Sequence, residues 1–599
     1  MFQSFETTLP RGDYKRRINR IRTCLIEEAI DAFILPRTDT HQNEFIEKHD
    51  ARVEWATGFT GSAGKCIILK DSCYLFVDGR YSLQVEKETD PKIFKCLDSG
   101  EFPFYDWLKQ KLKGKVIGID PRLHSASEIL YAQRICAKKL QFQFCENLID
   151  RVWKNQPKPS RALPKPHPKR FAGVDADIKK QSLLKELSNN KADSIILTKP
   201  ESICWLLNIR GNAIRHFPVV KCFFIFHKTG RGTLLLGNTK ISEILKKHLG
   251  ARVDIMDITR LTDCLKLLQG RRVQLDLSTC PFSIYQYVKI ISRKVIEADD
   301  PCELKRAIKN GVEIKGSINA HLLDALAFTK FLHWFDNVTD KESLDEIQIT
   351  KKIEQFRQNT GQLKDISFDT ICASGANAAI VHYRVTKSTN QKLKKDSLLL
   401  VDSGAHYKFG TTDLTRTLAI GSPNSEMIKT FTLVLKGMIA ISQLKWPAGL
   451  TGKELDILAR TALWKYGYDY DHGTGHGVGS YLSVHEGPHG ISRKNRVPLR
   501  SGMIVSNEPG YYKPSCFGIR IENILLIREF TPEYPSNKAM LEFQTLTLVP
   551  LDKKLIDVDL LSESEKCWIN AYHKKVFKKI GSFLNYSSKQ WLKEICKPI

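Results

Sequence analysis

The chain has 599 residues, of which 42% are hydrophobic and 26% charged. This balance is typical of globular proteins and excludes disordered and fibrous classes. The length exceeds what one hydrophobic core can organise, so several domains are expected. The formal net charge is +26, from 92 basic and 66 acidic residues. The basic residues are scattered with no block of five or more, which indicates solvated surface and no nucleic-acid partner.

Cysteine usage and the N-terminal residues indicate the compartment. The 15 cysteines run from Cys24 to Cys596 without a C-x-x-C pair, so a reducing environment is expected in place of a disulfide scaffold. The first residues lack the basic and apolar regions of a signal peptide. No apolar run approaches the roughly 20 residues that cross a bilayer. The sequence therefore predicts a cytoplasmic protein without a membrane partner.

The N-terminal half predicts two α/β domains in tandem. Helical patterns alternate with β-type runs between residues 20 and 150 and again between 178 and 300, which is typical of α/β domains. The predicted strands are 32–35, 66–69, 74–77, 116–119, 194–197, 223–226, 233–236 and 273–276. Closely spaced prolines between residues 155 and 168 predict a linker. The similar halves favour an ancient duplication, although no repeat exists at residue level.

The C-terminal half has a different pattern. From Glu303 it predicts long amphipathic helices, with apolar side chains at helical spacing at Ile314, Ile318, Leu322, Leu326 and Phe328. Glycine-rich hairpins follow from about residue 365, and a helical, aromatic tail begins near residue 560. The overall prediction is an α/β (α+β) protein with domains at residues 1–160, 170–305 and 306–599.

Two aspartates of the C-terminal half lie at the ends of β-type segments. The apolar run 398–401 ends in Asp402, and a turn through residues 404–410 leads to Asp413. We expect the two carboxylates to converge on paired strands. Taken alone, each aspartate has an ordinary alternative role as a turn-capping residue.

Two glutamates interrupt or end later β-type runs, Glu508 and Glu522. Alternation along the second run places Arg520 and Glu522 on one face. From this hairpin alone, an ordinary cross-strand ion pair on a solvated sheet is the favoured interpretation.

Four histidines fall within eighteen positions: His472, His476, His485 and His489. Glycines among them allow the backbone to approach a ligand. Four carboxylates with imidazole suit a pair of divalent ions such as Mn²⁺, whereas a cysteine-rich set would indicate structural zinc. Two ions roughly 3.5–4 Å apart ionise water and stabilise a developing oxyanion. The donor set therefore predicts hydrolytic chemistry.

The order of these acidic residues and histidines resembles the pita-bread metallopeptidases, and within them the aminopeptidase P family. The motifs that carry the resemblance are VHY at 381–383, DSGA at 402–405, GTTDLTRT at 410–417, HGTGHGVG at 472–479 and VHEGP at 484–488. GFTGSAG at 58–64, VDGRY at 77–81 and WLLNIRG at 205–211 resemble the N-terminal domains of the long, three-domain form. The resemblance implies two tandem α/β domains and a C-terminal pita-bread catalytic domain.

The resemblance also implies a set of metal ligands. Asp402 would hold one ion, and His476 and Glu508 the other. Asp413 and Glu522 would bridge the two ions. The expected metal is Mn²⁺, with Zn²⁺ or Co²⁺ as alternatives.

Further residues would act on the substrate. Glu508 would accept a proton from the attacking water, since a general base must lie within hydrogen-bond reach. His382, His472 and His485 would line the substrate pocket. Arg520 would orient the carboxylates, as residues behind metal ligands usually do.

The implied activity is removal of the first residue from peptides with proline in second position, by a homodimer. An X-Pro dipeptidase, which has one N-terminal domain, stays open as an alternative. A methionine aminopeptidase would lack both N-terminal domains, and a non-catalytic pita-bread binding protein would have lost ligands. The chain departs from the family at Ser515 and Cys516, where small residues such as Gly and Ala are usual, and Cys516 is open to soft ions and oxidation.

Overall fold

The structure is a computed structural model that describes residues 1–6, 13–238, 240–534 and 537–599. The chain divides into two compact units. One contains Glu303–Ile599, Arg170–Gly173 and the start of the chain, and the other contains the rest of the chain up to Cys302. Both units combine helices with sheets, which confirms the α/β class.

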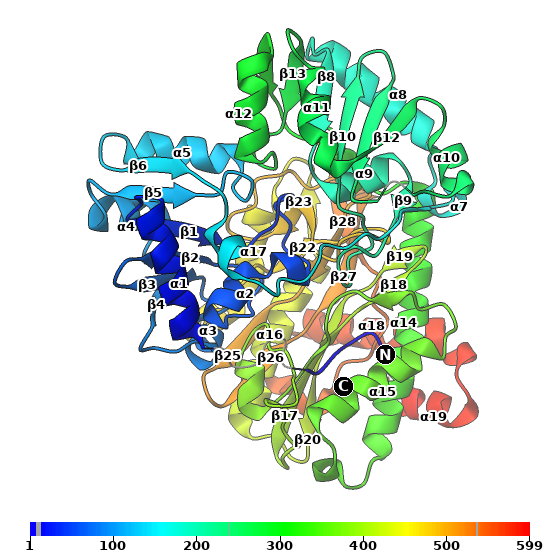
Figure 1. Cartoon of the computed structure of the whole chain (residues 1–599). Coiled ribbons are helices and arrows are strands. Elements are labelled where there is room, and N and C mark those ends of the chain that lie inside the picture. The colour runs from blue at the N-terminus through cyan, green and yellow to red at the C-terminus, as the bar shows by residue number, and fades with distance from the viewer. Residues whose placement is uncertain (7–12, 239, 535–536) are drawn as a thin grey trace. The chain divides into compact units, whose positions relative to one another are not determined.

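The first N-terminal sheet has the strand order β4-β3-β2-β1-β5-β6 (Figure 1). Its strands are β1 (Ala32–Pro36), β2 (Lys65–Leu69), β3 (Cys73–Val77), β4 (Phe94–Asp98), β5 (Val116–Ile119) and β6 (Gln141–Phe144). Only β2 is antiparallel to its neighbours among these six strands. The carboxyl ends of β1, β3, β4 and β5 therefore lie along one edge.

Alternate residues of these strands pack on opposite faces of the sheet, as the period of two requires. One face lies in a hydrophobic cluster with α4 (Phe104–Lys111) and α5 (Ala126–Cys136). The other face lies in a cluster with α1 (Tyr14–Glu27) and α6 (Leu148–Val152). The sheet is thus covered on both sides by helices.

The second N-terminal sheet repeats the first in order and in strand direction. Its order is β12-β11-β10-β8-β13-β14. Its strands are β8 (Ser194–Leu197), β10 (Cys222–His227), β11 (Gly232–Leu236), β12 (Val253–Asp257), β13 (Arg272–Leu275) and β14 (Lys294–Glu297). Here only β10 is antiparallel to its neighbours. The shared topology supports the duplication expected from the sequence.

The proline-rich segment has no helix or strand between residues 155 and 164. It then contains a two-residue strand, β7 (Lys165–Pro166), paired with β9 (Ile209–Arg210). The linker prediction therefore holds for most of its length. Proline is tolerated in β7 because this two-stranded pair consists of edge strands alone.

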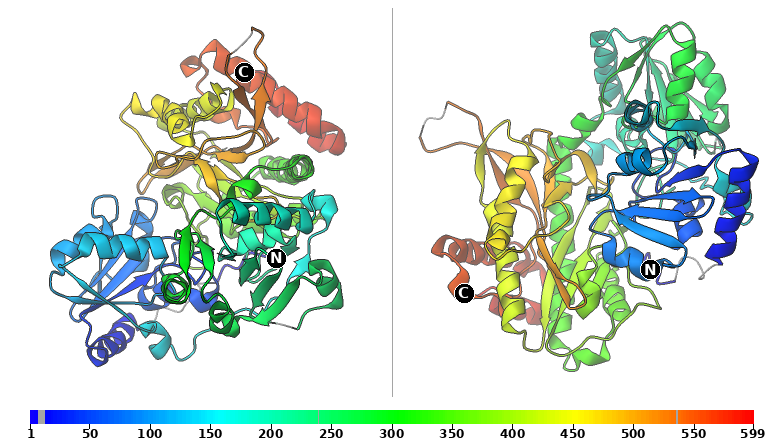
Figure 2. Two further views of the ribbon diagram at one scale, coloured as in Figure 1. Left: turned by 90° about the horizontal axis from the view of Figure 1, so that it is seen from above. Right: turned by 90° about the vertical axis from the view of Figure 1, so that its left-hand side faces the viewer.

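The C-terminal unit contains long helices and several small sheets (Figures 1 and 2). The helices are α14 (Gly311–Asn337), α15 (Glu346–Gln358), α16 (Ser425–Ser442), α17 (Gly452–Trp464), α18 (Glu563–Ile580) and α19 (Tyr586–Ile595). One sheet has the order β16-β17-β20, another the order β21-β28-β27-β24-β22-β23, and β25 pairs with β26. In chain order these strands are β16 (Ile371–Ser374), β17 (Ser397–Ser403), β20 (Leu414–Ile420), β21 (Lys445–Pro447), β22 (Gly475–Gly477), β23 (Glu486–Ile491), β24 (Ile504–Asn507), β25 (Gly510–Lys513), β26 (Phe517–Arg520), β27 (Asn523–Phe530) and β28 (Met540–Thr545). The predicted glycine-rich hairpins and helical tail are both present.

The predicted amphipathic helix is present as α14, in which Phe328 is buried and Leu322 and Leu326 pack against the same hydrophobic cluster, and polar side chains are buried beside this apolar stripe. Ile318 is 39% exposed, whereas Ser317, His321 and Asp324 are buried. The buried carboxylate of Asp324 accepts from Arg357 of α15, with Nε–Oδ1 at 2.7 Å and Nη2–Oδ2 at 3.0 Å. Because an ion pair satisfies this polar residue inside the protein, the apolar stripe alone does not identify every buried residue.

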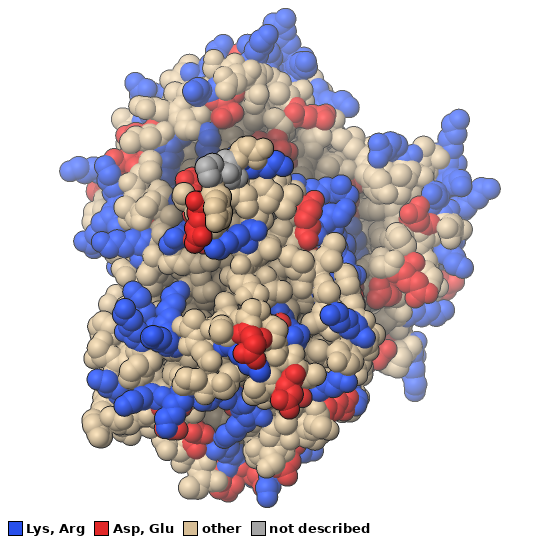
Figure 3. All heavy atoms as spheres, turned by 180° about the vertical axis from the view of Figure 1, so that it is seen from behind, with Lys and Arg blue, Asp and Glu red and all other residues tan. Residues whose placement is uncertain are grey.

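The surface charge and the cysteines agree with the scattered basic residues and the free thiols expected from the sequence. On the face in Figure 3, Lys and Arg side chains form small groups with acidic residues between them. All 15 cysteines are free thiols. Within the part of the chain that the structure describes, no helix combines the length and the apolar character of a membrane span.

Candidate metal centre

The five side chains with predicted metal-binding roles lie on neighbouring strands of the C-terminal unit. They are Asp402 in β17 (Ser397–Ser403), Asp413 just before β20 (Leu414–Ile420), His476 in β22 (Gly475–Gly477), Glu508 just after β24 (Ile504–Asn507) and Glu522 just before β27 (Asn523–Phe530). Strand β17 pairs with β20 so that Asp402 lies opposite Thr415. Strand β24 pairs with β27 so that Asn507 lies opposite Asn523.

Distances between donor atoms show that these groups converge. Ligand atoms of Asp413, His476 and Glu522 all lie within 4.8 Å of one another. His476 Nε2 is 3.4 Å from Glu508 Oε1 and 3.6 Å from Asp413 Oδ2. Asp402 Oδ2 accepts from Arg520 Nη2 at 2.6 Å. Residues as far apart in the sequence as Asp402 and Glu522, which are separated by 120 positions, thus form one acidic cluster.

Two buried oxygens in the cluster accept no hydrogen bond from any described residue. They are Asp402 Oδ1 and Asp413 Oδ1. A buried carboxylate oxygen without a donor costs free energy unless a cation or proton compensates it. Oxygen donors with one imidazole suit hard and borderline divalent ions such as Mn²⁺. The residues present therefore fit divalent metal ions.

The electrostatics of the cluster support the same conclusion. Burial raises the pKa of Asp402 to about 7, with Arg520 opposing the change and Asp413 and Glu508 adding to it. Burial and the neighbouring carboxylates raise the pKa of Glu522 well above its ordinary value. Burial opposes protonation of His476, but Asp413 and Glu508 outweigh it and raise the pKa of His476 to about 9. Without cations, these groups retain protons to reduce their mutual repulsion.

The backbone of β22 comes very close to its neighbours. A Cβ atom at Gly475 would lie 1.9 Å from the Ser506 carbonyl oxygen, and one at Gly477 would lie 2.2 Å from the Glu486 carbonyl oxygen. Any side chain at either position would push β22 away from the adjacent strands. The glycines on both sides of His476 therefore hold its imidazole at the acidic cluster.

Two hydroxyl groups, which the sequence analysis did not identify, orient the acidic residues. Thr415 Oγ1 donates to Glu522 Oε2 at 2.9 Å and accepts from Arg520 Nε at 3.3 Å. Ser506 Oγ donates to Glu508 Oε1 at 3.1 Å and accepts from the backbone N–H of His476 at 2.9 Å. Serine and threonine are too common in strands for their positions to indicate such a role.

The imidazole of His476 is oriented by its own strand. Its Nδ1 lies 2.9 Å from the Gly477 carbonyl oxygen. Since a carbonyl only accepts, Nδ1 carries a proton and Nε2 faces the carboxylates. A hydrogen bond of this kind is the usual way to fix the tautomer of a metal-binding histidine.

A chain of hydrogen bonds connects Asp402 to His472 through Tyr512, a residue that the sequence analysis missed. Arg520 Nη1 donates to the Tyr512 hydroxyl at 2.7 Å, and that hydroxyl lies 2.8 Å from His472 Nε2. His472 Nδ1 donates to the Gly473 carbonyl at 2.8 Å. Tyr512 therefore donates to His472 Nε2 and fixes both the ring and its tautomer.

Substitution of Tyr512 by phenylalanine is expected to lower kcat/KM for peptide hydrolysis by about 10- to 100-fold, since it removes an acceptor from Arg520 and a donor to His472. The pH dependence of kcat/KM should shift as well, because His472 Nε2 loses a hydrogen-bond donor. Tyr511→Phe is the matched control, because its half-buried hydroxyl bonds to none of the described residues. Unchanged kinetics in Tyr512→Phe would contradict this role.

The two remaining predicted histidines are half-buried. The ring of His485 lies 4.3 Å from that of His476, edge to face. His382 follows Val381, whose carbonyl oxygen accepts from Arg520 Nη1 at 3.4 Å. The ring of His485 thus lies beside a predicted metal ligand, and His382 directly follows a residue that contacts Arg520. Cys516 is exposed at the turn between β25 (Gly510–Lys513) and β26 (Phe517–Arg520), and does not belong to the group of converging donors.

Arg416 connects the cluster to the C-terminal tail. Its buried guanidinium donates to the backbone carbonyl of Glu522 at 2.6 Å and of Thr415 at 2.8 Å. It also donates to the carbonyl of Val549 at 2.7 Å and to the hydroxyl of Tyr572 in α18 at 3.0 Å. One side chain therefore holds the tail against the strands that carry the acidic residues.

Comparison with family models covers most of the chain. Residues 317–529 match the metallopeptidase family M24, and residues 539–599 match the C-terminal region of that family. Residues 17–152 and 155–313 each match a creatinase/prolidase N-terminal domain.

Similar proteins are known along the whole length. "Probable Xaa-Pro aminopeptidase P" of Paracoccidioides brasiliensis (strain Pb03) is 38% identical, over 98% of this chain and 99% of that protein. The crystal structure of an X-prolyl aminopeptidase from Caenorhabditis elegans, described as a cytosolic enzyme with a di-nuclear active site, has a TM-score of 0.93 and 32% identity. It covers 98% of this chain and 100% of that chain. An Xaa-Pro dipeptidase from Bacillus anthracis has a TM-score of 0.51 and 26% identity, and covers 63% of this chain and 99% of its own.

The pita-bread fold of the C-terminal unit and the convergence of acidic residues with histidine define a metallopeptidase, and the pita-bread prediction is confirmed. The chain belongs to metallopeptidase family M24, in the branch that carries two creatinase/prolidase N-terminal domains.

Proposed function

We propose that this protein is an Xaa-Pro aminopeptidase, which removes the first residue of peptides whose second residue is proline. The observation that carries the proposal is the buried cluster of four carboxylates and one imidazole with two unsatisfied carboxylate oxygens. Full-length similarity to Xaa-Pro aminopeptidases supports the same function.

Two divalent ions are the proposed cofactor, with Mn²⁺ as the first candidate. Asp402 would hold one ion, His476 and Glu508 the other, and Asp413 and Glu522 both. The di-nuclear site of the Caenorhabditis elegans enzyme supports this number. Such ions, when bound, lower the pKa of water and polarise the carbonyl group of the scissile bond.

The side chains of this protein would perform the proton transfers. Glu508 takes a proton from water as the water oxygen attacks the scissile carbonyl carbon, and burial, which raises the pKa of Glu508, favours its protonated state. The same proton can then pass to the proline nitrogen as the C–N bond breaks. His382, His472 and His485 would hold the substrate, with Tyr512 fixing the orientation of His472.

Proline specificity has a physical basis in the substrate. The bond before proline is a tertiary amide, which has no N–H to donate. Peptidases that require this donor are excluded. A site that relies on metal ions and on the histidines around the carbonyl group needs no such donor.

We also propose the domain boundaries 1–160, 170–305 and 306–599, a homodimeric assembly and a cytoplasmic location. The separate matches to two N-terminal domains and one catalytic domain support the division. The cytosolic location of the Caenorhabditis elegans enzyme and the 15 free thiols support the compartment.

Substrate choice tests this function against the dipeptidase alternative. Metal-loaded protein should release the first residue from Ala-Pro-Ala far faster than from the dipeptide Ala-Pro, and should leave Ala-Ala-Ala intact. Amino-acid release is measured by chromatography, with protein that was dialysed against a chelator as the control. Cleavage of Ala-Pro alone would identify a dipeptidase. A protein that purifies without bound metal and cleaves none of these peptides would be identified as a binding protein.

A further inference from the structure

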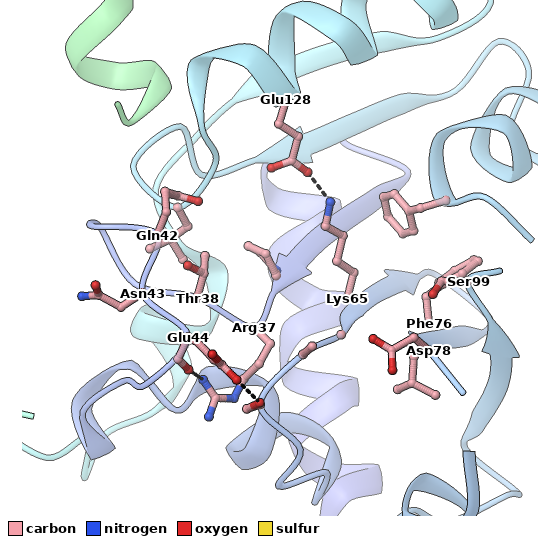
Figure 4. Close-up of a pocket in the computed structure, with 17 residues that line it drawn as sticks. Arg37, Thr38, Gln42, Asn43, Glu44, Lys65, Phe76, Asp78, Ser99 and Glu128 are labelled. Atoms are coloured by element: carbon pink, nitrogen blue, oxygen red, sulfur yellow. Dashed lines mark hydrogen bonds and ion pairs between the residues drawn. The ribbon is translucent and has the colours of Figure 1, made fainter. Parts of the chain in front are cut away.

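A cavity of about 460 Å³ opens in the first N-terminal domain, at the carboxyl edge of its sheet (Figure 4). Its wall includes Arg37 after β1, Asp78 after β3 and Glu128 in the first turn of α5. In open α/β sheets, ligands bind outside the carboxyl ends of the strands. The volume lies within the range of small-molecule sites, roughly 300–1,000 Å³.

Most charged groups in this wall have charged partners within the protein. Lys65 and Glu128 form an ion pair (Figure 4). Asp78 pairs with Arg80, with Oδ2 2.7 Å from Nη2. These groups have little electrostatic reason to attract a ligand.

Arg37 is different. Its guanidinium donates one long hydrogen bond, from Nη1 to the Glu44 carbonyl oxygen at 3.4 Å, and forms no ion pair within the described chain. A guanidinium carries five N–H donors in a planar fork. Burial lowers the pKa of Arg37, and Glu54, Tyr81 and Glu44 offset this only in part. The cavity thus has one half-buried guanidinium most of whose N–H donors are unused by the described residues, with the carboxylates of Glu54, Glu44 and Asp39 near enough to favour its charged form.

The rest of the wall has an apolar part, with Ala63, Phe76, Val77, Phe104 and Leu123. The polar part includes Gln42, Asn43, Glu44 and Ser62. An aliphatic side chain or a pyrrolidine ring fits such a surface, and the volume limits the ligand to a few residues of peptide. The combination of one under-satisfied guanidinium and an apolar wall is suited to a small organic anion.

We propose that this cavity binds the carboxylate end of a short peptide, with the carboxylate on Arg37 and the last side chain against the apolar wall. A planar carboxylate matches the donor fork of a guanidinium and pairs with it in two parallel hydrogen bonds. The carboxylate follows from the cavity alone, and the assignment to peptides rests on the proposed function.

Titration calorimetry on the metal-loaded full chain tests the site with Pro-Leu, a peptide of the kind that X-Pro cleavage releases. Arg37→Gln should weaken Pro-Leu binding by roughly 10- to 100-fold, the effect of removing a charge-assisted hydrogen-bond pair. Pro-Leu-amide should bind the wild type about as weakly as Pro-Leu binds Arg37→Gln. Arg134→Gln, an exposed arginine of α5, is the matched control and should bind as the wild type does.

Further variants distinguish loss of the binding site from misfolding. Arg37→Lys keeps the charge without the fork and should bind with intermediate affinity. Ala63→Leu fills the cavity and should weaken binding although Arg37 is intact. Circular dichroism and hydrolysis of Ala-Pro-Ala report the fold of each variant.

Three results would overturn the proposal: equal affinity of Arg37→Gln and wild type, equal affinity for the acid and the amide, or free leucine binding as tightly as Pro-Leu. Failure of the proposed function gives a different result. In that case the wild type would not cleave Ala-Pro-Ala, and binding of Pro-Leu that depends on Arg37 would still support this site.

Discussion

Replacement of Asp413 by asparagine is expected to lower kcat/KM for Ala-Pro-Ala on the order of 10³-fold while making the metal-free protein more stable. Asparagine has nearly the same shape but no charge. It removes one of the proposed shared ligands, so the protein should also retain less metal, which plasma emission spectrometry measures. Asp413 raises the pKa of Asp402 and of Glu522 by repulsion, and its neutralisation relieves that repulsion when cations are absent.

The opposite signs of the two effects distinguish this site from a structural ion pair. Loss of a structural aspartate would lower both activity and melting temperature. Asp254→Asn provides the control, since its carboxylate is 56% exposed and pairs with an exposed arginine. It should change neither quantity. Retained turnover in Asp413→Asn would mean that the metal ions, and hence the active site, lie elsewhere.

Metal-free protein is expected to lose stability as the pH rises from 7 to 8.5, and bound Mn²⁺ should make this slope shallower or reverse it. In the folded state the pKa of His476 is raised from 6.5 to about 9, and that of Glu522 is raised well above 4.5. His476 therefore holds a proton in this window that the unfolded chain has largely released, and the raised pKa of Glu522 acts in the same direction. The folded state therefore binds more protons, and stability falls by about 1.4 kcal/mol per pH unit for each such group.

Other groups titrate in this window independently of the metal. Burial raises the pKa of thiols such as Cys73 and Cys145 to about 11, so their ionisation in the unfolded chain adds the same downward slope with and without Mn²⁺. Buried neutral histidines such as His489, in which burial lowers the pKa to about 3, oppose the trend only below their unfolded value of 6.5. Metal ions require deprotonated ligands, so their affinity rises with pH. Thermal melts at pH 7 and 8.5, with chelator or with saturating Mn²⁺, measure both slopes. The idea fails if the two slopes are equal.

Sequence patterns were sufficient to predict the central strands of the two N-terminal sheets. All eight predicted strands are present, because central strands are continuous apolar runs. Four further strands, which the sequence patterns did not predict, form the sheet edges: β4, β6, β12 and β14. These strands, such as Gln141–Phe144, mix polar and apolar residues because one side faces water, and four or five residues are too few to establish a period.

In the site, the acidic residues and histidines were predictable because glycines and apolar runs surround them. The hydroxyls of Thr415, Ser506 and Tyr512 were not, since their partners lie as far as 107 positions away in the sequence. The buried polar residues of α14 were not predictable for the same reason. A pattern of apolar residues contains no information about a carboxylate such as Asp324 whose partner comes from another helix.

The bonds that Arg416 makes imply that the segment from Val549 to the C-terminus is required for catalysis, although it contributes no proposed ligand. Arg416 bonds both to the strands that carry the acidic residues and to the tail, so departure of the tail would leave its guanidinium without part of its support. A proteolytic cut before Val549 would free the carbonyl groups of Thr415 and Glu522 along with the tail. Turnover should therefore be lost after such a cut before the protein unfolds globally. Activity would then depend on an intact C-terminal tail.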